Sequence, residues 1–188
     1  MILIFGAIAS LVLGIGMTVS ACYIFLAIVL APAIIEGGIS PLAAHLYVLY
    51  WGVLSFITPP VAIAAITASS ISNTSALKTG FLSMRLGSIL FFLPILFVFD
   101  PSMLMQGTAI NIIFSVSMAI FAIIIISAGF EGYMYIFGRL NKIYRILCFS
   151  SGLLILMPNL TSKYIGVGIL MVTTLSLMLI NLKNKNKS

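Results

Sequence analysis

The stretch "SLVLGIGMTVSACYIFLAIVLAP", residues 10–32, is apolar for most of its length but has two glycines and a threonine near its centre and a proline at its end. An apolar segment of this length is typical of a helix that crosses a membrane. In hydrocarbon no water satisfies backbone groups that a break sets free, so irregular backbone persists there only inside protein or beside a polar cavity. The interruption therefore indicates a site.

The composition is that of an integral membrane protein. Of the 188 residues, 62% are hydrophobic and 6% are charged, and the mean hydropathy is +1.29. A soluble domain carries roughly 25% charged residues. Apolar runs of about 20 residues, the length of helix that spans a bilayer, recur along the chain without the alternation of barrel strands. We therefore expect an all-α, polytopic membrane protein.

The opening stretch predicts a re-entrant helical hairpin over residues 1–31. Two apolar segments, residues 1–13 and 19–31, are each too short to span a bilayer, and Gly14–Thr18 separates them. The alternative is one kinked helix, which at this length would need a strong tilt. We favour the hairpin, with Pro32 ending its second arm and a polar turn over residues 34–40.

A second interruption follows in "PLAAHLYVLYWGVLSFITPPVAIAAITASSI", residues 41–71. Helix is expected from Pro41 to Ile57, where it meets Thr58-Pro59-Pro60. Two consecutive prolines remove two hydrogen-bond donors and clash with the preceding turn, so the helix must unwind here. The sequence thus predicts a proline-broken helix over residues 41–71.

About four further transmembrane helices are expected, over residues 79–99, 108–128, 146–157 and 164–182, followed by a short lysine-rich tail. With these helices, eight lysines and arginines fall on one side of the membrane and one, Lys163, on the other. The positive-inside rule then places the C-terminus on the cytoplasmic side of the membrane. We expect a multi-pass protein of the inner membrane. The eight are Lys78, Arg85, Arg139, Lys142, Arg145, Lys183, Lys185 and Lys187.

Several residues that suggest other functions have simpler interpretations. The net charge of +6 is explained by topology rather than by nucleic acid, and Cys22 and Cys148 have neither disulfide nor metal-site spacing. We interpret His45 as an interfacial or structural residue rather than one whose protonation serves the function. We expect the Arg85 side chain to reach the lipid headgroups rather than to bind a carboxylate substrate. With one histidine and three acidic residues, the chain is not expected to be an enzyme.

The order of these pieces resembles a known transporter family. The glycine tip, "LAPA", "PLAAHLYVLYWGVLSFITPPVAIAA", "KTGF..MRLG" and "LPILFVFDPSML" cover roughly residues 12–105 and are similar to the large or fused permease subunit of tripartite ATP-independent periplasmic (TRAP) transporters. The resemblance implies that residues 1–105 form a segment of an elevator-type transport domain. It also implies that residues 106–188 form C-terminal transmembrane helices.

The resemblance also implies a function. Such permeases are Na⁺-coupled importers of an organic anion, usually a carboxylate, received from a periplasmic binding protein. The Na⁺ site would lie between the tip and the opposing break, with Thr18 and Thr58 also near the substrate. No cofactor or metal beyond Na⁺ is implied, and the partners would be the binding protein and the remaining permease portion or a small membrane subunit. The implied cation-site residues are Gly14, Gly16, Met17, Thr18, Ser55, Thr58, Pro59 and Pro60.

Two departures from the family pattern remain. The family tip usually has proline where this chain has Thr18, and the family permease is far longer, so this chain looks like a C-terminal fragment. The alternative function is therefore a non-transporting membrane fragment, or a structural partner of a separately encoded permease portion.

Overall fold

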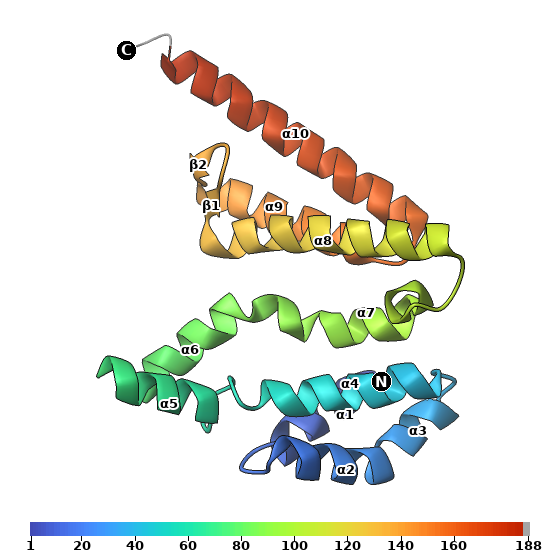
Figure 1. Ribbon diagram of the computed structural model, residues 1–188. Coiled ribbons are helices and arrows are strands. Elements are labelled where there is room, and N and C mark those ends of the chain that lie inside the picture. Colours follow the sequence, from blue (N-terminus) through green and yellow to red (C-terminus); the bar gives the residue numbers. More distant parts are fainter. Residues whose placement is uncertain (186–188) are drawn as a thin grey trace. The chain divides into compact units, whose positions relative to one another are not determined.

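The computed structural model describes residues 1–185, and the side chains of residues 1–179. The chain divides into two compact units, Met1–Leu104 and Met105–Ser188. Both are helical, apart from a short two-stranded sheet in the second unit (Figure 1). This architecture agrees with the predicted all-α class.

The first unit consists of short helices. They are α1 (Ile2–Leu13), α2 (Val19–Val29), α3 (Ala31–Glu36), α4 (Pro41–Leu54), α5 (Ile63–Ser72), α6 (Ala76–Leu86), the 3₁₀ turn η1 (Ser88–Phe91), α7 (Leu93–Phe99) and the 3₁₀ turn η2 (Pro101–Leu104).

Helices α1 and α2 are the two half-length segments of the opening stretch. Thr18 begins α2, and its Oγ1 accepts a hydrogen bond from the Ala21 N–H at 3.4 Å. A threonine oxygen at this position satisfies one of the free donors of the first turn. The prediction that Pro32 ends the second arm is wrong, because α2 ends at Val29 and Pro32 lies in the first turn of α3, where its missing N–H costs no helical bond. The expected turn at 34–40 is accordingly helical as far as Glu36.

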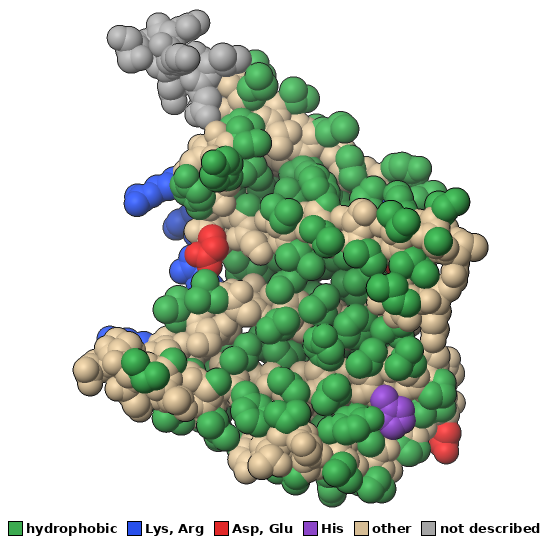
Figure 2. Space-filling view, in the orientation of Figure 1, with side chains coloured by type: hydrophobic (Ala, Val, Ile, Leu, Met, Phe, Trp, Pro, Cys, Tyr) green, Lys and Arg blue, Asp and Glu red, His purple; other side chains and the backbone are tan. Residues whose placement is uncertain are grey.

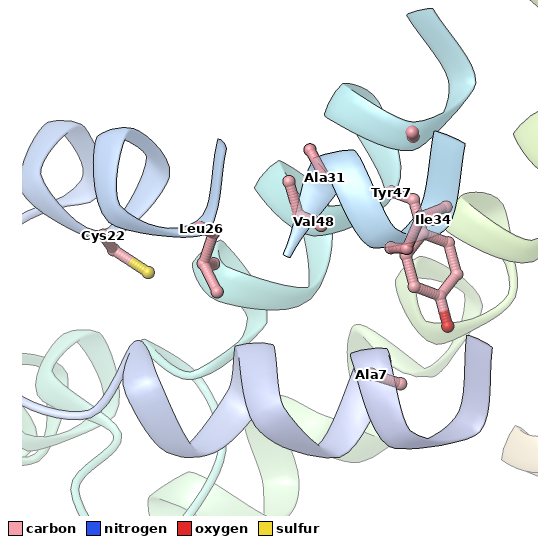
Figure 3. Packing of buried hydrophobic residues seen from close by; sticks show 8 residues of the cluster. Ala7, Cys22, Leu26, Ala31, Ile34, Tyr47 and Val48 are labelled. Carbon is pink, nitrogen blue, oxygen red and sulfur yellow. The ribbon is translucent and has the colours of Figure 1, made fainter. Parts of the chain in front are cut away.

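The core of this unit lies where α1, α2, α3 and α4 meet (Figure 3). Leu26, Ile34 and Val48, from three different helices, are fully buried. Tyr47 is also buried, and its hydroxyl donates a hydrogen bond of 2.5 Å to the Leu3 carbonyl of α1. Helices α1 and α2 thus both pack directly against α4, the first half of the broken helix.

The predicted break between α4 and α5 is present. Helix α4 ends at Leu54, earlier than the expected Ile57, because its last turn tightens into bonds of 3₁₀ type, including Ile57 N–H to the Leu54 carbonyl at 3.2 Å. Helix α5 begins only at Ile63, after Ala62 adopts a positive φ of 33°.

The expected single helix over residues 79–99 is wrong. Helix α6 starts at Ala76 and ends at Leu86, and α6 is bent by 68° from the η1–α7 segment that follows. Gly87 ends α6, and Pro94 lies in the first turn of α7, where proline starts a helix. A glycine that ends one helix and a proline that begins the next therefore divide one apolar run into two helices.

The second unit is a helical bundle. Its elements are α8 (Ala109–Glu131), β1 (Tyr133–Met134), β2 (Gly138–Arg139), α9 (Lys142–Leu156) and α10 (Leu160–Lys185). Helix α9 packs against both α8 and α10. It starts at Lys142, four residues before the expected start at Ile146, and the antiparallel strands β1 and β2 fill the expected loop. Of the predicted lysine-rich tail, residues 186–188 lie outside the described residues.

Helix lengths in the described part of the chain limit how many can span a membrane. Helix α8 and the Leu160–Leu179 part of α10 are long and apolar enough, and the bent α6–α7 pair adds a third if it counts as one span. Helix α9, with 15 residues, is about 22 Å long at 1.5 Å per residue, which is longer than the expected segment 146–157 but shorter than a hydrocarbon core of about 30 Å. Helices α1, α2, α4 and α5 are shorter apolar helices, as the two interruptions require.

Candidate functional site

The C-terminal ends of α1 and α4 meet at a single polar contact. Gly14 ends α1 and Ser55 ends α4. The Ser55 hydroxyl lies 3.0 Å from the Gly14 carbonyl and 2.7 Å from the Gly52 carbonyl, so its proton is shared between the two acceptors. Ser55 is only 4% exposed. This contact joins the glycine tip to the residue that ends the helix before the proline break.

Gly14 is required here because of space. Its φ of −69° is ordinary for any residue, but a Cβ added to it would lie 2.6 Å from the Gly52 carbonyl oxygen and 2.7 Å from Ser55 Oγ. The turn itself depends on Gly16, whose φ of +77° lies in the left-handed region that favours glycine. The two glycines of the tip therefore have different functions.

The other predicted tip residues contact the break less directly. Gly16 is exposed, with no atom within 4 Å of a Cβ built on it. Met17 packs against the hydrophobic core, and Thr18 is exposed at the start of α2. Within residues 1–185, no hydrogen bond joins these three residues to the break. The structure thus brings Gly14, rather than Gly16, Met17 or Thr18, to Ser55.

The Thr-Pro-Pro loop is largely bonded to itself. The Thr58 hydroxyl donates to the Leu54 carbonyl at 2.7 Å, and the Thr58 carbonyl accepts from the Ala62 N–H at 3.1 Å. The Phe56 carbonyl accepts from the Ala64 N–H at 3.0 Å and so ties the two halves of the broken helix together. Pro59 is partly buried and Pro60 is exposed.

Two further glycines shape the site and were not among the predicted residues. A Cβ on Gly52 would lie 2.8 Å from Cys22 Sγ, so α2 packs on the backbone of α4 at this point. A Cβ on Gly80 would lie 2.9 Å from Pro59 Cγ, so α6 packs directly on the break. The matched phrase "KTGF" contains Gly80, but sequence alone does not show which element its bare face contacts.

Ser10 is a third residue that sequence reasoning missed. It is fully buried in α1, and its hydroxyl has no hydrogen-bond partner in the part of the chain that the structure describes. It lies four residues before Gly14 and hence on the same face of the helix. A buried hydroxyl without a partner is uncommon and requires an explanation.

His45 and Arg85 lie outside this contact. The His45 Nδ1 and the Tyr23 hydroxyl are 3.2 Å apart and link α4 to α2. Arg85 is exposed and lies in the last turn of α6, whereas a helix over residues 79–99 would have placed it in an early turn. A cation there complements the negative end of the helix dipole.

The electrostatics of the site come from helix ends rather than from charged side chains. The ends of α1 and α4 that meet at Gly14 and Ser55 are C-terminal and carry partial negative charge. The helices that resume after each interruption, α2 and α5, present N-terminal ends with partial positive charge. Among the described residues there is no group of His, Cys, Asp and Glu side chains that would hold a metal ion.

Comparison with known proteins identifies the family. The family model described as the tripartite ATP-independent periplasmic transporter, DctM component, matches residues 1–112, which include both interruptions and all of the first unit. No curated protein and no solved structure gives a match. The match covers more than half of the 188 residues. The chain therefore belongs to the DctM permease family of TRAP transporters.

Proposed function

We propose that this chain is part of a Na⁺-coupled secondary transporter that imports an organic anion, such as a carboxylate. A periplasmic binding protein delivers the anion, and the remaining permease portion or a small membrane subunit completes the transporter. The hairpin of α1 and α2 is re-entrant in this proposal, and the C-terminus is cytoplasmic. Family membership supports the transport function, while Na⁺, the carboxylate and the orientation are our inferences from the site and the charge pattern.

The observation that carries the proposal is the hydrogen bond from Ser55 to Gly14. It holds together two interruptions that are 41 residues apart in the sequence. Secondary transporters bind their coupling ions where unwound carbonyls and helix C-termini converge. Here two such C-termini converge at one buried hydroxyl.

The oxygen atoms of the two interruptions suit Na⁺. In the Thr-Pro-Pro loop, the carbonyls of Ile57, Pro59 and Pro60 accept no backbone hydrogen bond within the described residues. The Ser10 and Ser55 hydroxyls lie near the ends of α1 and α4, and the Thr58 hydroxyl in the loop is a further ligand in this proposal. Carbonyl and hydroxyl oxygens are ligands that a small hard cation accepts without any carboxylate. The orphaned Ser10 hydroxyl is explained if a bound ion, rather than protein, provides its partner.

In this proposal the organic anion binds at the N-terminal ends of α2 and α5, rather than at the C-terminal helix ends that favour Na⁺. The N-terminal ends of α2 and α5 favour negative charge because their first N–H groups have no helical partner. Thr18 begins α2 with its hydroxyl at that end, and Thr58 precedes α5. A carboxylate between these ends would be drawn toward the same region as Na⁺, which couples the two ligands electrostatically.

Sodium binding to the purified chain tests this proposal directly. We expect NaCl to raise the melting temperature in detergent more than KCl or choline chloride at the same concentration. Ser55→Ala should remove most of this difference. Ser69→Ala is the matched control, because Ser69 is 5% exposed and donates a hydrogen bond to the Ile66 carbonyl in α5.

Uptake then distinguishes transport from the alternative. The chain is expressed with the remaining permease portion and a binding protein, and uptake of labelled carboxylates is measured with and without a Na⁺ gradient. Gradient-dependent uptake that is lost in Ser55→Ala supports the proposal. Equal stabilisation by all salts, with no uptake, would favour a non-transporting membrane fragment.

A further inference from the structure

A cavity in the second unit is independent of the transport site. It has a volume of about 390 Å³ and lies between the end of α8 and the first turns of α9. Two of its lining residues are cationic and the others are apolar or glycine. They are Gly129, Phe130, Lys142, Arg145, Ile146 and Phe149.

Arg145 is held rigidly on one side of this cavity. Its Nε donates to the Gly129 carbonyl at 3.1 Å and its Nη2 donates to the Phe130 carbonyl at 2.7 Å. These carbonyls belong to the last turn of α8, where a cation complements the helix dipole. A Cβ on Gly132 would lie 2.9 Å from Arg145 Nε, so the side chain also covers this residue.

Capping of α8 explains the position of Arg145 but not the position of Lys142 at the same cavity. This residue is exposed, lines the same cavity and lies three residues before Arg145 on α9. Two like charges at this spacing repel one another on a helix surface. In the described part of the chain the Lys142 ammonium makes no ion pair. An anion near both cations would relieve this repulsion.

The charge around this end of the unit is also unbalanced. Glu131 is the one acidic residue in the sequence of residues 105–188, and it lines a different cavity. Arg139 in β2 adds a third cation to Lys142 and Arg145. Figure 2 shows basic side chains, with an acidic one among them, gathered where α8 ends and α9 begins.

The depth of the cavity in a membrane follows from α8. This helix of 23 residues is about 34 Å long at 1.5 Å per residue, slightly more than a hydrocarbon core of about 30 Å. Its last turn therefore lies at the level of the lipid headgroups. Ile146 lines the cavity and is 68% exposed, as expected for a side chain that faces acyl chains.

From these observations we propose that the cavity binds the headgroup phosphate of an anionic phospholipid. The phosphate lies between Lys142 and Arg145, and the acyl chains run along Ile146 and the adjacent apolar surface of α9. Basic pockets between transmembrane helices recognise lipid headgroups in this way. A small soluble anion would use the cations but would leave the apolar wall uncovered.

Native mass spectrometry of the full chain tests the proposal. The purified chain is delipidated and mixed with equal amounts of phosphatidylglycerol and phosphatidylcholine that have the same acyl chains. We expect phosphatidylglycerol to be retained in preference. Lys142→Gln should lower its retention about fivefold, the effect expected for one basic side chain near the headgroups.

Two controls keep the result specific. Lys163→Gln removes a cation that lies over the Phe114 ring in the same unit and should leave lipid retention unchanged. Inorganic phosphate in large excess should not displace the phosphatidylglycerol. Equal retention of both lipids, an unchanged Lys142→Gln variant, an equal loss in Lys163→Gln, or displacement by inorganic phosphate would each overturn the proposal.

Discussion

The Ser55 hydroxyl lies 3.0 Å from the Gly14 carbonyl, at the point where α1 and α4 both end. The contact is buried and depends on the absence of a side chain at residue 14, because a Cβ there would lie 2.7 Å from Ser55 Oγ. In this contact one hydroxyl proton is shared between two carbonyls, beside helix ends that carry partial negative charge and therefore favour a nearby cation.

Gly14→Ala tests the close approach. The added methyl group would overlap the Gly52 carbonyl, so we expect a loss of about 1–3 kcal/mol of stability, as for other overpacked sites. Stability is measured as the melting temperature of the purified chain. Gly168→Ala is the control, since no atom lies within 4 Å of a Cβ at that residue. Equal behaviour of the two variants would contradict the packing of α1 on α4.

Thr58→Val tests whether the Thr58 hydroxyl is a Na⁺ ligand or only a hydrogen-bond donor to the end of α4. Valine keeps the shape but removes the oxygen, so we expect the Na⁺ concentration for half-maximal uptake by the completed permease to rise about three- to tenfold, the equivalent of one lost hydrogen bond. Thr67→Val is the matched control, because Thr67 donates an equivalent bond of 3.0 Å to the Ile63 carbonyl. The prediction fails if both variants retain the wild-type Na⁺ dependence.

Gly80→Ala tests whether α6 supports the break. Its methyl group would approach Pro59 Cγ to 2.9 Å, and we expect destabilisation by about 1–2 kcal/mol. Pro59→Ala removes the carbon involved. The double variant should therefore lose less stability than the sum of the single variants, with a coupling of at least about 0.5 kcal/mol. Strict additivity in a double-mutant cycle would show that the two residues do not interact.

Cysteine labelling tests the membrane orientation. In a Cys22→Ala, Cys148→Ala background, Lys185→Cys should resist an impermeant thiol reagent in intact cells, whereas Gly37→Cys should react. The expectation rests on the excess of lysine and arginine that the topology assigns to the cytoplasmic side. Labelling at Lys185→Cys and protection at Gly37→Cys would reverse the topology.

The parts of the fold that sequence predicted are those set by local chemistry. Gly16 and the two prolines after Thr58 interrupt helices for reasons contained in their own backbones, and both interruptions are present. The bend at Gly87 was missed because one glycine in an apolar run is ordinary in membrane helices. The need for glycine at residue 87 comes from a residue that is distant in the sequence, since a Cβ on Gly87 would lie 2.9 Å from Ile57 Cδ1.

The same distinction applies to the site. The family resemblance implied both Ser55 and Gly14, one at each interruption, and a hydrogen bond joins them in the structure. Gly52 and Gly80 were missed because their function is to let another helix approach, which depends on tertiary packing. Ser10 was missed because an isolated serine in a membrane helix usually bonds its own backbone, and only the structure shows that this one does not.

The packing of α2 on α4 also makes Cys22 a natural reporter of the motion of α2 relative to α4. Its side chain is 2% exposed, and its sulfur lies against Gly52, where no side chain separates the helices. A maleimide has no room there until α2 moves away from α4. In a Cys148→Ala background, the alkylation rate of this native thiol would measure how often α2 separates from α4. Bound ligands that hold the two helices together would slow the alkylation.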